Sequence, residues 1–300
     1  MTSRHRSRRP PAWIRAIAND RESGATVLAQ RAAKGLLNAL KGRQRGLGFM
    51  ETEELARLGR QLQLAQPAMA PLFHLANVAL LGASAKGPAE GATRSVVKFL
   101  KSLERAKGQL LRVATPFIPK GERLLTHSAS SAVEALLREV EGVSVLCTES
   151  RPGHEGLGLS RRLARAGVSV RLIPDLAAFM AFKEVALFLV GADALTPRGL
   201  IHKIGTAPLA RWARGHGVPV FTLCTTQKFL PERMLPAPTL ESEGLFDRTP
   251  WRHLTSVVTE RGPMGKEEVL QAIASIQIAR AWKTLACEDR ELRVRRYPMA

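Results

Sequence analysis

Short apolar runs recur between residues 123 and 229, and polar residues cluster where each run stops. Most of the runs are rich in β-branched residues, and each except the last is followed by a helix-compatible segment. This pattern is typical of buried parallel strands joined by crossover helices. The predicted strands are residues 123–127, 143–148, 168–173, 185–190 and 218–224. The pattern therefore predicts an α/β fold with a Rossmann-like parallel sheet.

Upstream of these runs, apolar residues recur at helical spacing, as Trp13, Ile14 and Ile17 do. Further predicted helices cover residues 23–41, 52–64, 67–81 and 89–113. Such stripes are more often core than ligand contacts, so they predict an N-terminal helical domain over residues 13–115. Because Pro116 and Pro119 cannot continue the last of these helices, the domain boundary is placed there.

The predicted α/β ligand-binding domain covers residues 120–287. After residue 229 several prolines predict an irregular passage to about residue 250. A short strand at residues 255–259 and a final helix at residues 266–286 would complete the domain. With 45% hydrophobic residues, the chain of 300 residues has enough apolar side chains for a substantial core.

Part of the net charge of +19 is concentrated at the two ends of the chain. Arginines gather in residues 1–12, a predicted disordered basic tail, and in residues 288–300, a basic C-terminal tail. The other basic residues are scattered on predicted helices with few aromatic residues to stack on bases, which favours a solvated basic surface over a nucleic-acid site. An anionic membrane or an acidic partner would also suit this charge, and the N-terminal tail could also be a short organelle presequence.

No apolar run is long enough to span a bilayer, and the N-terminus lacks the apolar stretch of a secretion signal. We therefore expect a soluble, cytoplasmic protein. The three cysteines, Cys147, Cys224 and Cys287, have no paired short spacing, which argues against a disulfide framework and a zinc site. Two of them lie in predicted strands and are expected to be buried thiols. We expect no metal and no cofactor.

The carboxyl ends of parallel strands meet along one edge of a sheet, where ligands bind. Small residues from Ser128 to Ser131 open a predicted helix there, where backbone N–H groups can hold a phosphate. Arg151, Asp193 and Lys203 follow other strands. A phosphate cradle, a guanidinium, a carboxylate and an ammonium at one edge suit a small phosphorylated metabolite.

Several motifs occur in a characteristic order, namely Thr126-His127-Ser128, residues 148–156, Ile173-Pro174-Asp175, residues 190–195, Lys203-Ile204-Gly205-Thr206 and Gln227-Lys228-Phe229. This set resembles the initiation factor 2B-like superfamily over roughly the C-terminal half of the chain. The superfamily unites regulatory subunits of eukaryotic translation initiation factor 2B with isomerases of ribose 1,5-bisphosphate and methylthioribose 1-phosphate. The resemblance implies a phosphorylated sugar or nucleotide as ligand, and a homodimer formed through the α/β domain.

For the isomerases, the resemblance implies catalytic roles for Asp193 and Ser128. Asp193 matches an aspartate that acts as acid/base, although it could simply cap the turn that follows its strand. Ser128 stands where the isomerases have cysteine, and an unassisted hydroxyl cannot exchange protons near neutral pH as a thiol can. Ser128 is therefore predicted to be a polar contact to the sugar. His127 is predicted to be structural.

The resemblance also implies a set of residues that hold the substrate and its phosphate. They are Gly24, Ala25, Arg151, His202, Lys203, Gly205 and Thr206. Gly24-Ala25 matches a turn near the substrate phosphate. Arg151 suits a bidentate phosphate contact or a salt bridge with a nearby glutamate. His202 stands where relatives usually carry asparagine and could hydrogen-bond a sugar hydroxyl.

Two functions of different classes follow. The first is a sugar-phosphate aldose–ketose isomerase similar to ribose 1,5-bisphosphate isomerase, which the presence of Asp193 favours. The second is a non-catalytic regulatory subunit of the initiation factor 2B type that senses a sugar phosphate or nucleotide and passes its occupancy to a protein partner. The absent cysteine favours this second function, and so does Ala70-Pro71, which stands where the isomerases have Arg-Pro.

Overall fold

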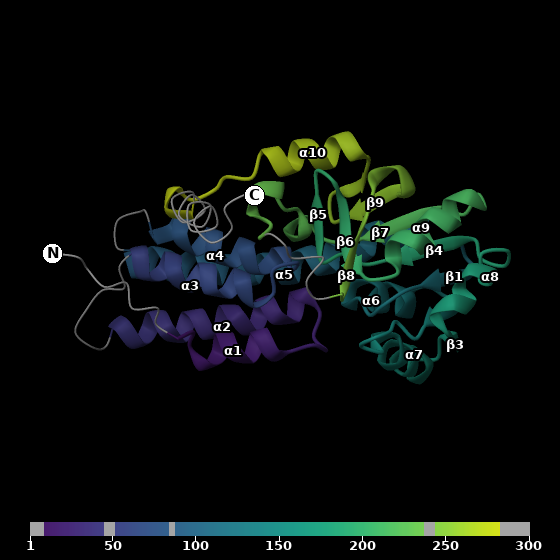
Figure 1. Ribbon diagram of the computed structural model, residues 1–300, viewed down its shortest axis with the longest axis horizontal. Coiled ribbons are helices and arrows are strands. Elements are labelled where there is room, and N and C mark those ends of the chain that lie inside the picture. Colours follow the sequence, from purple (N-terminus) through teal and green to yellow (C-terminus); the bar gives the residue numbers. More distant parts are fainter. Residues whose placement is uncertain (1–8, 45–51, 84–87, 237–243, 283–300) are drawn as a thin grey trace, which may run out of the picture.

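The computed structural model describes residues 9–44, 52–83, 88–236 and 244–282. The first part is helical and the second contains the sheets (Figure 1), so the predicted fold class is confirmed. The helices of the first part are α1 (Ala12–Asn19), α2 (Ala25–Gln44), α3 (Thr52–Ala65), α4 (Ala70–Ala83) and α5 (Pro88–Ala114). A short 3-10 helix, Thr115–Phe117, follows α5 at the predicted boundary.

The main sheet has the strand order β10-β9-β7-β4-β1-β2-β3, and only β10, at its edge, is antiparallel to its neighbour. The six parallel strands include all of those predicted, each shortened by no more than three residues. They are β1 (Arg123–Thr126), β2 (Ser144–Thr148), β3 (Ser169–Ile173), β4 (Leu187–Val190), β7 (Val220–Leu223) and β9 (Ser256–Thr259). Strand β10 is Gly262–Met264, and the helices are α6 (Ser131–Glu139), α7 (Glu155–Arg165), α8 (Ala178–Ala181), α9 (Thr206–Gly215) and α10 (Lys266–Ala274).

A second, three-stranded antiparallel sheet was not predicted. It contains β5 (Ala194–Thr196), β6 (Gly199–Lys203) and β8 (Phe246–Thr249). The expectation that a helical segment directly follows the fourth strand is therefore wrong, because the β5–β6 hairpin lies between β4 and α9. The predicted irregular passage to residue 250 contains β8. The final helix ends at Ala274, and residues 283–286 lie outside the described residues.

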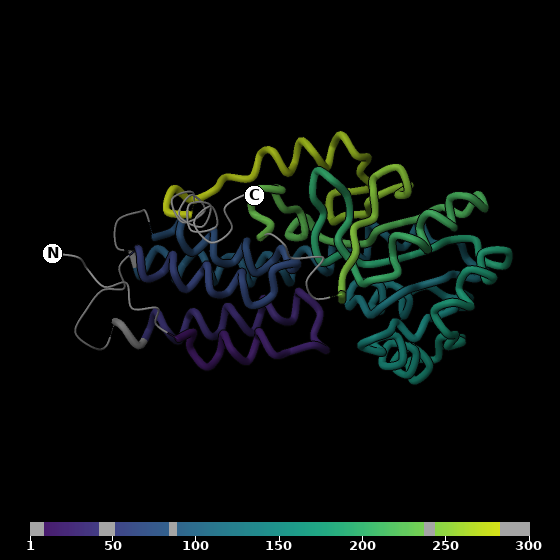
Figure 2. Tube along the Cα trace, viewed as in Figure 1, coloured from purple at the N-terminus to yellow at the C-terminus, as the bar shows by residue number. Residues whose placement is uncertain are grey.

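The helical part and the small three-stranded sheet share a hydrophobic core. Ala194 of β5 and Ile201 of β6 belong to the same buried cluster as the side chains of α2, α3 and α4. After α10 the chain returns to the helices, as the yellow trace in Figure 2 shows. Asn77 of α4 fixes this return, because its side chain donates to the carbonyl of Gln277 at 2.8 Å and accepts from the backbone N–H of Ala279 at 2.9 Å.

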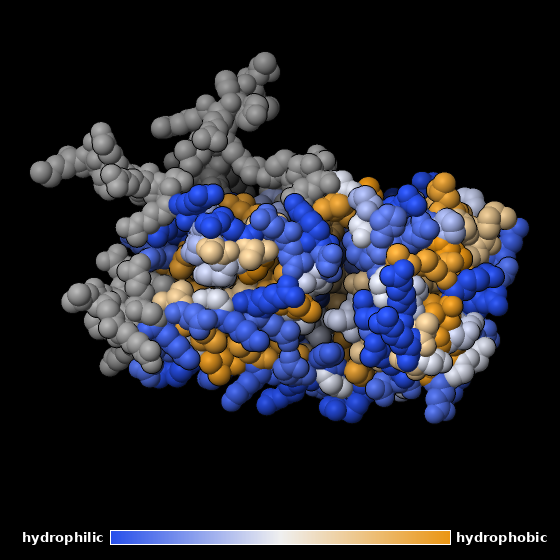
Figure 3. Space-filling model, turned by 90° about the horizontal axis from the view of Figure 1, so that it is seen from below, coloured by the Kyte–Doolittle hydropathy of each residue, from blue (hydrophilic) through white to orange (hydrophobic). Residues whose placement is uncertain are grey.

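The two predicted tails lie almost entirely outside the described residues. Figure 3 shows hydrophilic side chains spread over both halves of one face of the molecule. Within the described parts of the chain, no helix has the length and apolar character needed to cross a membrane. Cys147 and Cys224 are buried free thiols, as predicted, and Cys287 lies outside the described residues.

Candidate functional site

A pocket of about 380 Å³ lies where the helical part meets the carboxyl ends of β1, β4 and β7. The start of α2 and the residues between β1 and α6 contribute to its wall, and so does β6 of the small sheet. The pocket therefore forms at the predicted edge, but the unpredicted hairpin supplies part of it.

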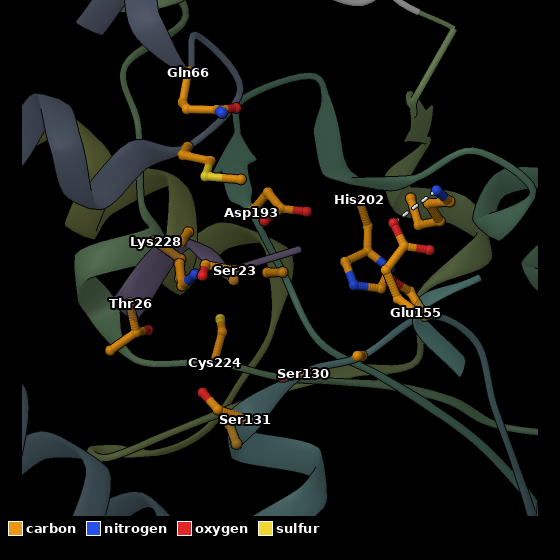
Figure 4. Close-up of a pocket in the computed structure, with 18 of the residues that line it drawn as sticks. Ser23, Thr26, Gln66, Ser130, Ser131, Glu155, Asp193, His202, Cys224 and Lys228 are labelled. Carbon is orange, nitrogen blue, oxygen red and sulfur yellow. Dashed lines mark hydrogen bonds and ion pairs between the residues drawn. The ribbon is translucent and has the colours of Figure 1, made fainter. Parts of the chain in front are cut away.

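The structure brings six of the nine predicted site residues to this pocket. They are Gly24, Ala25, Ser128, Asp193, His202 and Lys203. The other three, Arg151, Gly205 and Thr206, are not among the residues that line it. Figure 4 shows Asp193 between His202 and Glu155 on one side of the view and Lys228 and Ser23 on the other.

Asp193 lies between β4 and β5, and backbone bonds hold it on both sides. Its N–H donates to the carbonyl of Ile201 at 3.0 Å, and its carbonyl accepts from Ala70 of α4 at 3.1 Å. Burial raises the pKa of the carboxyl from 3.8 to about 6, against the opposing effect of the Lys228 ammonium. Asp193 is therefore mainly ionised at neutral pH and close enough to its pKa to exchange protons.

The neighbouring wall carries His202 and Lys203 of β6. Lys203 is buried, and its Nζ donates to Oε1 of Glu155 at 2.8 Å. The other oxygen of Glu155, Oε2, is buried and has no partner among the described residues. Burial lowers the pKa of His202 to about 3, so this imidazole is neutral, and its Nδ1 hydrogen-bonds the hydroxyl of Thr206 at 3.1 Å.

Lys228 is a second buried lysine of the pocket, which the sequence analysis did not assign to the site. It follows β7 in a 3-10 turn, Thr226–Lys228, and its side chain is 8% exposed. The structure gives its Nζ no hydrogen bond or ion pair to the described residues. Burial lowers the pKa of this ammonium, whereas the Asp193 carboxylate raises it. Its place after a predicted strand, in Gln227-Lys228-Phe229, was the available signal.

Ser128 follows β1 in the left-handed region, with φ 66°. Its backbone N–H donates to the hydroxyl of Ser150 at 2.7 Å, which fixes this strained turn at the pocket wall. The preceding His127 hydrogen-bonds Thr148 at 2.7 Å and the carbonyl of Ile204 at 2.8 Å, in agreement with its predicted structural role. The thiol that the pocket does contain is Cys224, and burial raises its pKa so that it stays protonated.

Arg151 lies outside the pocket. Its side chain is exposed, and its Nε donates to Oε2 of Glu149 at 3.0 Å. This is the salt bridge that the sequence analysis weighed against a phosphate contact. A phosphate bound in the pocket would therefore meet lysines and backbone N–H groups rather than this guanidinium.

Gly205 and Thr206, which the resemblance assigns to the substrate and its phosphate, lie at the start of α9. The carboxylate of Asp247 already occupies this helix end, because its Oδ2 accepts from the N–H groups of Gly205 at 2.8 Å and Ala207 at 3.0 Å. The hydroxyl of Thr206 donates to the carbonyl of Lys203 at 2.6 Å. These two residues thus shape the turn after β6, and an acidic side chain holds the helix end.

The fold and the pocket define a class of protein: an α/β protein with an N-terminal helical part and a pocket at the strand ends that contains buried charged side chains. Among the described residues, no three His, Cys, Asp or Glu side chains gather so as to hold a metal ion. The model of the Initiation factor 2 subunit family matches residues 21–243, and the chain belongs to this family.

Proteins named as translation initiation factor eIF-2B subunits and proteins named as ribose 1,5-bisphosphate isomerases are both similar to this chain. A putative translation initiation factor eIF-2B subunit 2-like protein of Pyrococcus horikoshii is 28% identical over 83% of this chain and 94% of its own length. A ribose 1,5-bisphosphate isomerase of Haloferax volcanii is 30% identical over 82% and 86%. The solved Pyrococcus horikoshii OT3 translation initiation factor eIF-2B has a TM-score of 0.71 and 26% identity, and the match covers 84% of this chain and 95% of that one.

Proposed function

We propose that this chain is a cofactor-free aldose–ketose isomerase that acts on a phosphorylated sugar. The observation that carries the proposal is Asp193, a buried carboxyl with a pKa of about 6 in a pocket that also contains two buried lysines. The Haloferax volcanii relative named ribose 1,5-bisphosphate isomerase supports the same class of reaction.

The chemistry needs one group that moves a proton. Interconversion of an aldose and a ketose removes a proton from one carbon and delivers a proton to its neighbour. A carboxyl with a pKa near the working pH can perform both steps, because it accepts and returns the proton without a large energetic cost. The ammonium groups of Lys203 and Lys228 stabilise negative charge that develops on the sugar oxygens. His202, as a neutral imidazole, hydrogen-bonds a hydroxyl.

NMR-monitored turnover tests this proposal with ribose 1,5-bisphosphate and methylthioribose 1-phosphate as substrates. We expect conversion of one of them by the native chain and a loss of about a hundredfold or more in the Asp193→Asn variant. Ser128→Cys, which adds the thiol of the isomerases, is expected to retain or raise the rate. Conversion that is unchanged in Asp193→Asn would show that the proposed role of Asp193 is wrong.

A regulatory function is the second candidate, and a specific observation favours it. Ser128 replaces the cysteine expected in an isomerase, and the Cys224 thiol is held protonated by burial. The pocket would then bind a sugar phosphate or nucleotide and pass its occupancy to a protein partner. The relative named as an eIF-2B subunit 2-like protein supports this function. Ligand shifts in NMR without turnover, together with a retained partner in a pull-down, would distinguish it from the enzyme.

Assembly is a separate part of the proposal. The resemblance implies a homodimer, and light scattering of the purified chain tests the oligomeric state. A strictly monomeric mass at micromolar concentration would contradict the dimer without bearing on the chemistry of the pocket.

A further inference from the structure

The turn that carries Lys228 is held by a buried carboxylate from the neighbouring strand. Strand β9 lies parallel to β7, and Leu223 pairs in register with Val258, so the residues that follow the two strands lie side by side. Glu260 follows β9 directly and is 9% exposed. Its Oε2 accepts from the backbone N–H of Thr226 at 2.9 Å, and its Oε1 accepts from the hydroxyl of the same residue. Both oxygens of this carboxylate are therefore bonded to one residue of the turn.

Thr226 begins the 3-10 turn that ends at Lys228. The first N–H groups of a helical turn have no partner within it, so the Glu260 carboxylate satisfies a donor that the turn cannot satisfy itself. The chain after the turn is held separately, because the N–H of Leu230 donates to the carbonyl of Leu195 on β5 at 2.8 Å. The position of the Lys228 side chain thus depends on Glu260 before it and on β5 after it.

Two other carboxylates hold neighbouring turns in the same way. Asp175, which follows β3, accepts from the N–H groups of Ser150 at 2.6 Å and Arg151 at 2.8 Å, just after β2. Asp247 of β8 accepts from the two N–H groups that open α9 after β6. In each case the acid belongs to the strand that pairs with the strand before the turn. Glu260 applies this arrangement to a turn whose last residue lines the pocket.

Lys228 acts on the site through its charge partner, Asp193, and both line the pocket (Figure 4). Burial is the largest influence on the pKa of each group, and each group opposes it for the other by favouring the charged form. Glu155 also raises the pKa of Asp193 and Lys203 also lowers it. Two further groups that line the pocket are neutral because of burial, namely His202 and Cys224. The helical side of the pocket adds Asp20, Arg21, Glu22 and Lys107.

We propose that Glu260 is a positioning residue of the site, which through Thr226 holds the Lys228 ammonium beside Asp193. Two effects of Glu260 on the pKa of Asp193 have opposite signs. Its negative charge acts directly as a like charge, so loss of that charge alone would lower this pKa. Loss of Lys228 from its place would raise it. The inference rests on the proposed isomerase for its effect on turnover, but the placement of Lys228 can be measured without turnover.

Carbon-13 NMR titration of the full chain, labelled at its aspartate carboxyls, tests the inference. The Asp193 resonance is assigned by its loss in Asp193→Asn. Glu260→Gln keeps the shape of the side chain, but its amide nitrogen cannot accept a hydrogen bond. We expect the pKa of Asp193 to rise in Glu260→Gln by about 0.5 or more, and to rise at least as far in Lys228→Met. The acidic limb of the pH–rate profile should move to higher pH by the same amount.

Thr226→Val is a second variant that leaves the charge of Glu260 in place. It removes the hydroxyl donor, so the pKa of Asp193 should rise in the same direction as in Glu260→Gln but less far. The double variant of Glu260→Gln and Lys228→Met should titrate no higher than Lys228→Met alone, because no ammonium is left to be displaced. The other charged groups of the pocket are unchanged in all these variants, so they do not contribute to the differences.

Glu268→Gln provides the matched control. The Glu268 carboxylate accepts from the backbone N–H of Gly265 at 2.7 Å at the start of α10, and it does not line the pocket. This variant therefore removes a comparable carboxylate from a helix start that is not part of the pocket. The pKa of Asp193 should stay at its native value.

An unchanged or lowered pKa of Asp193 in Glu260→Gln and Thr226→Val would overturn the inference. An equal rise in Glu268→Gln would overturn it as well, because the effect would then be a general loosening of the fold. The isomerase proposal fails differently, through turnover that is absent or independent of Asp193, whereas the titration needs no substrate. The two proposals can thus be rejected separately.

Discussion

At the scale of single residues, burial of the Asp193 carboxyl destabilises the folded protein at neutral pH, and the proposed acid/base role would account for this. Its side chain has no hydrogen-bond partner among the described residues, and burial makes its ionised form unfavourable in the folded protein. The folded state thus holds the proton more tightly than the unfolded state does. Folding takes up a proton between about pH 4 and pH 6, so the contribution of Asp193 to stability falls as pH rises through this window.

Asp193→Asn should therefore stabilise the ligand-free protein at pH 7.5, by about 1–3 kcal/mol, because it removes the buried charge. At pH 4 the gain should be much smaller, since the native carboxyl is then almost fully protonated in the folded state and about half protonated in the unfolded state. Urea unfolding of the native and variant chains at the two pH values measures the difference. Equal effects at both values would contradict the raised pKa.

The sequence identified Asp193 because it follows a long apolar strand, where a charged side chain is conspicuous. It did not identify Lys228, because one lysine among 45 basic residues has no local pattern that shows burial. The partner of Lys203 was also hidden, since Glu155 lies 48 residues from Lys203 and only the fold brings them together. Candidate site residues that directly follow a predicted strand could thus be predicted. Which of the charged side chains are paired with one another could not.

At the scale of elements, the six parallel strands of the main sheet were predictable because each is a short apolar run with polar residues after it, and most of these runs are rich in β-branched residues. The β5–β6 hairpin was not, because β5 has three residues and both strands are buried throughout, so neither shows alternation. Yet this hairpin carries His202 and Lys203 to the pocket. The elements that complete the site are thus the ones with the weakest local signal.

Gly199 is the position on which the hairpin depends. Its φ is +135°, and a Cβ there would lie 2.2 Å from the carbonyl oxygen of Thr249 on β8. Gly199→Ala should cost about 3 kcal/mol or more in unfolding free energy, because it adds both backbone strain and a clash with main chain. Ligand binding should weaken too, since β6 positions His202 and Lys203.

Gly108→Ala is the control for this substitution. Gly108 lies within α5, where an added Cβ meets nothing within 4 Å, so alanine should stabilise the chain by about 0.5–1 kcal/mol. Urea unfolding and a ribose 1-phosphate titration of both variants supply the comparison. A Gly199→Ala variant with native stability and affinity would show that the small sheet does not position the pocket wall.

At the scale of the whole molecule, the two predicted domains share one buried cluster. Ala194 and Ile201 of the small sheet and Trp282 near the described C-terminal end pack with the helices, and Trp282 contacts Phe73 edge-on with ring centroids 5.5 Å apart. The pocket lies across the same junction, with α2 on one side and the strand ends on the other. Because the shared core and the pocket both lie at this junction, separation of the helical part from the small sheet should disrupt both.

We therefore expect the helical part and the sheet to unfold in a single transition. Trp13 reports on α1 and Trp251 on the small sheet, where its Nε1 donates to the carbonyls of Thr196 and Pro197. Two variants, each retaining one of these tryptophans and carrying Phe at the other tryptophan positions, should show coincident urea midpoints. Trp282→Ala in place of Trp282→Phe in each variant should lower both midpoints together, by about 3–5 kcal/mol in unfolding free energy, because the cavity lies in the shared cluster. Loss of the Trp13 transition at lower urea, with that of Trp251 unmoved, would mean that the two parts fold independently and that the pocket lies between separately stable domains.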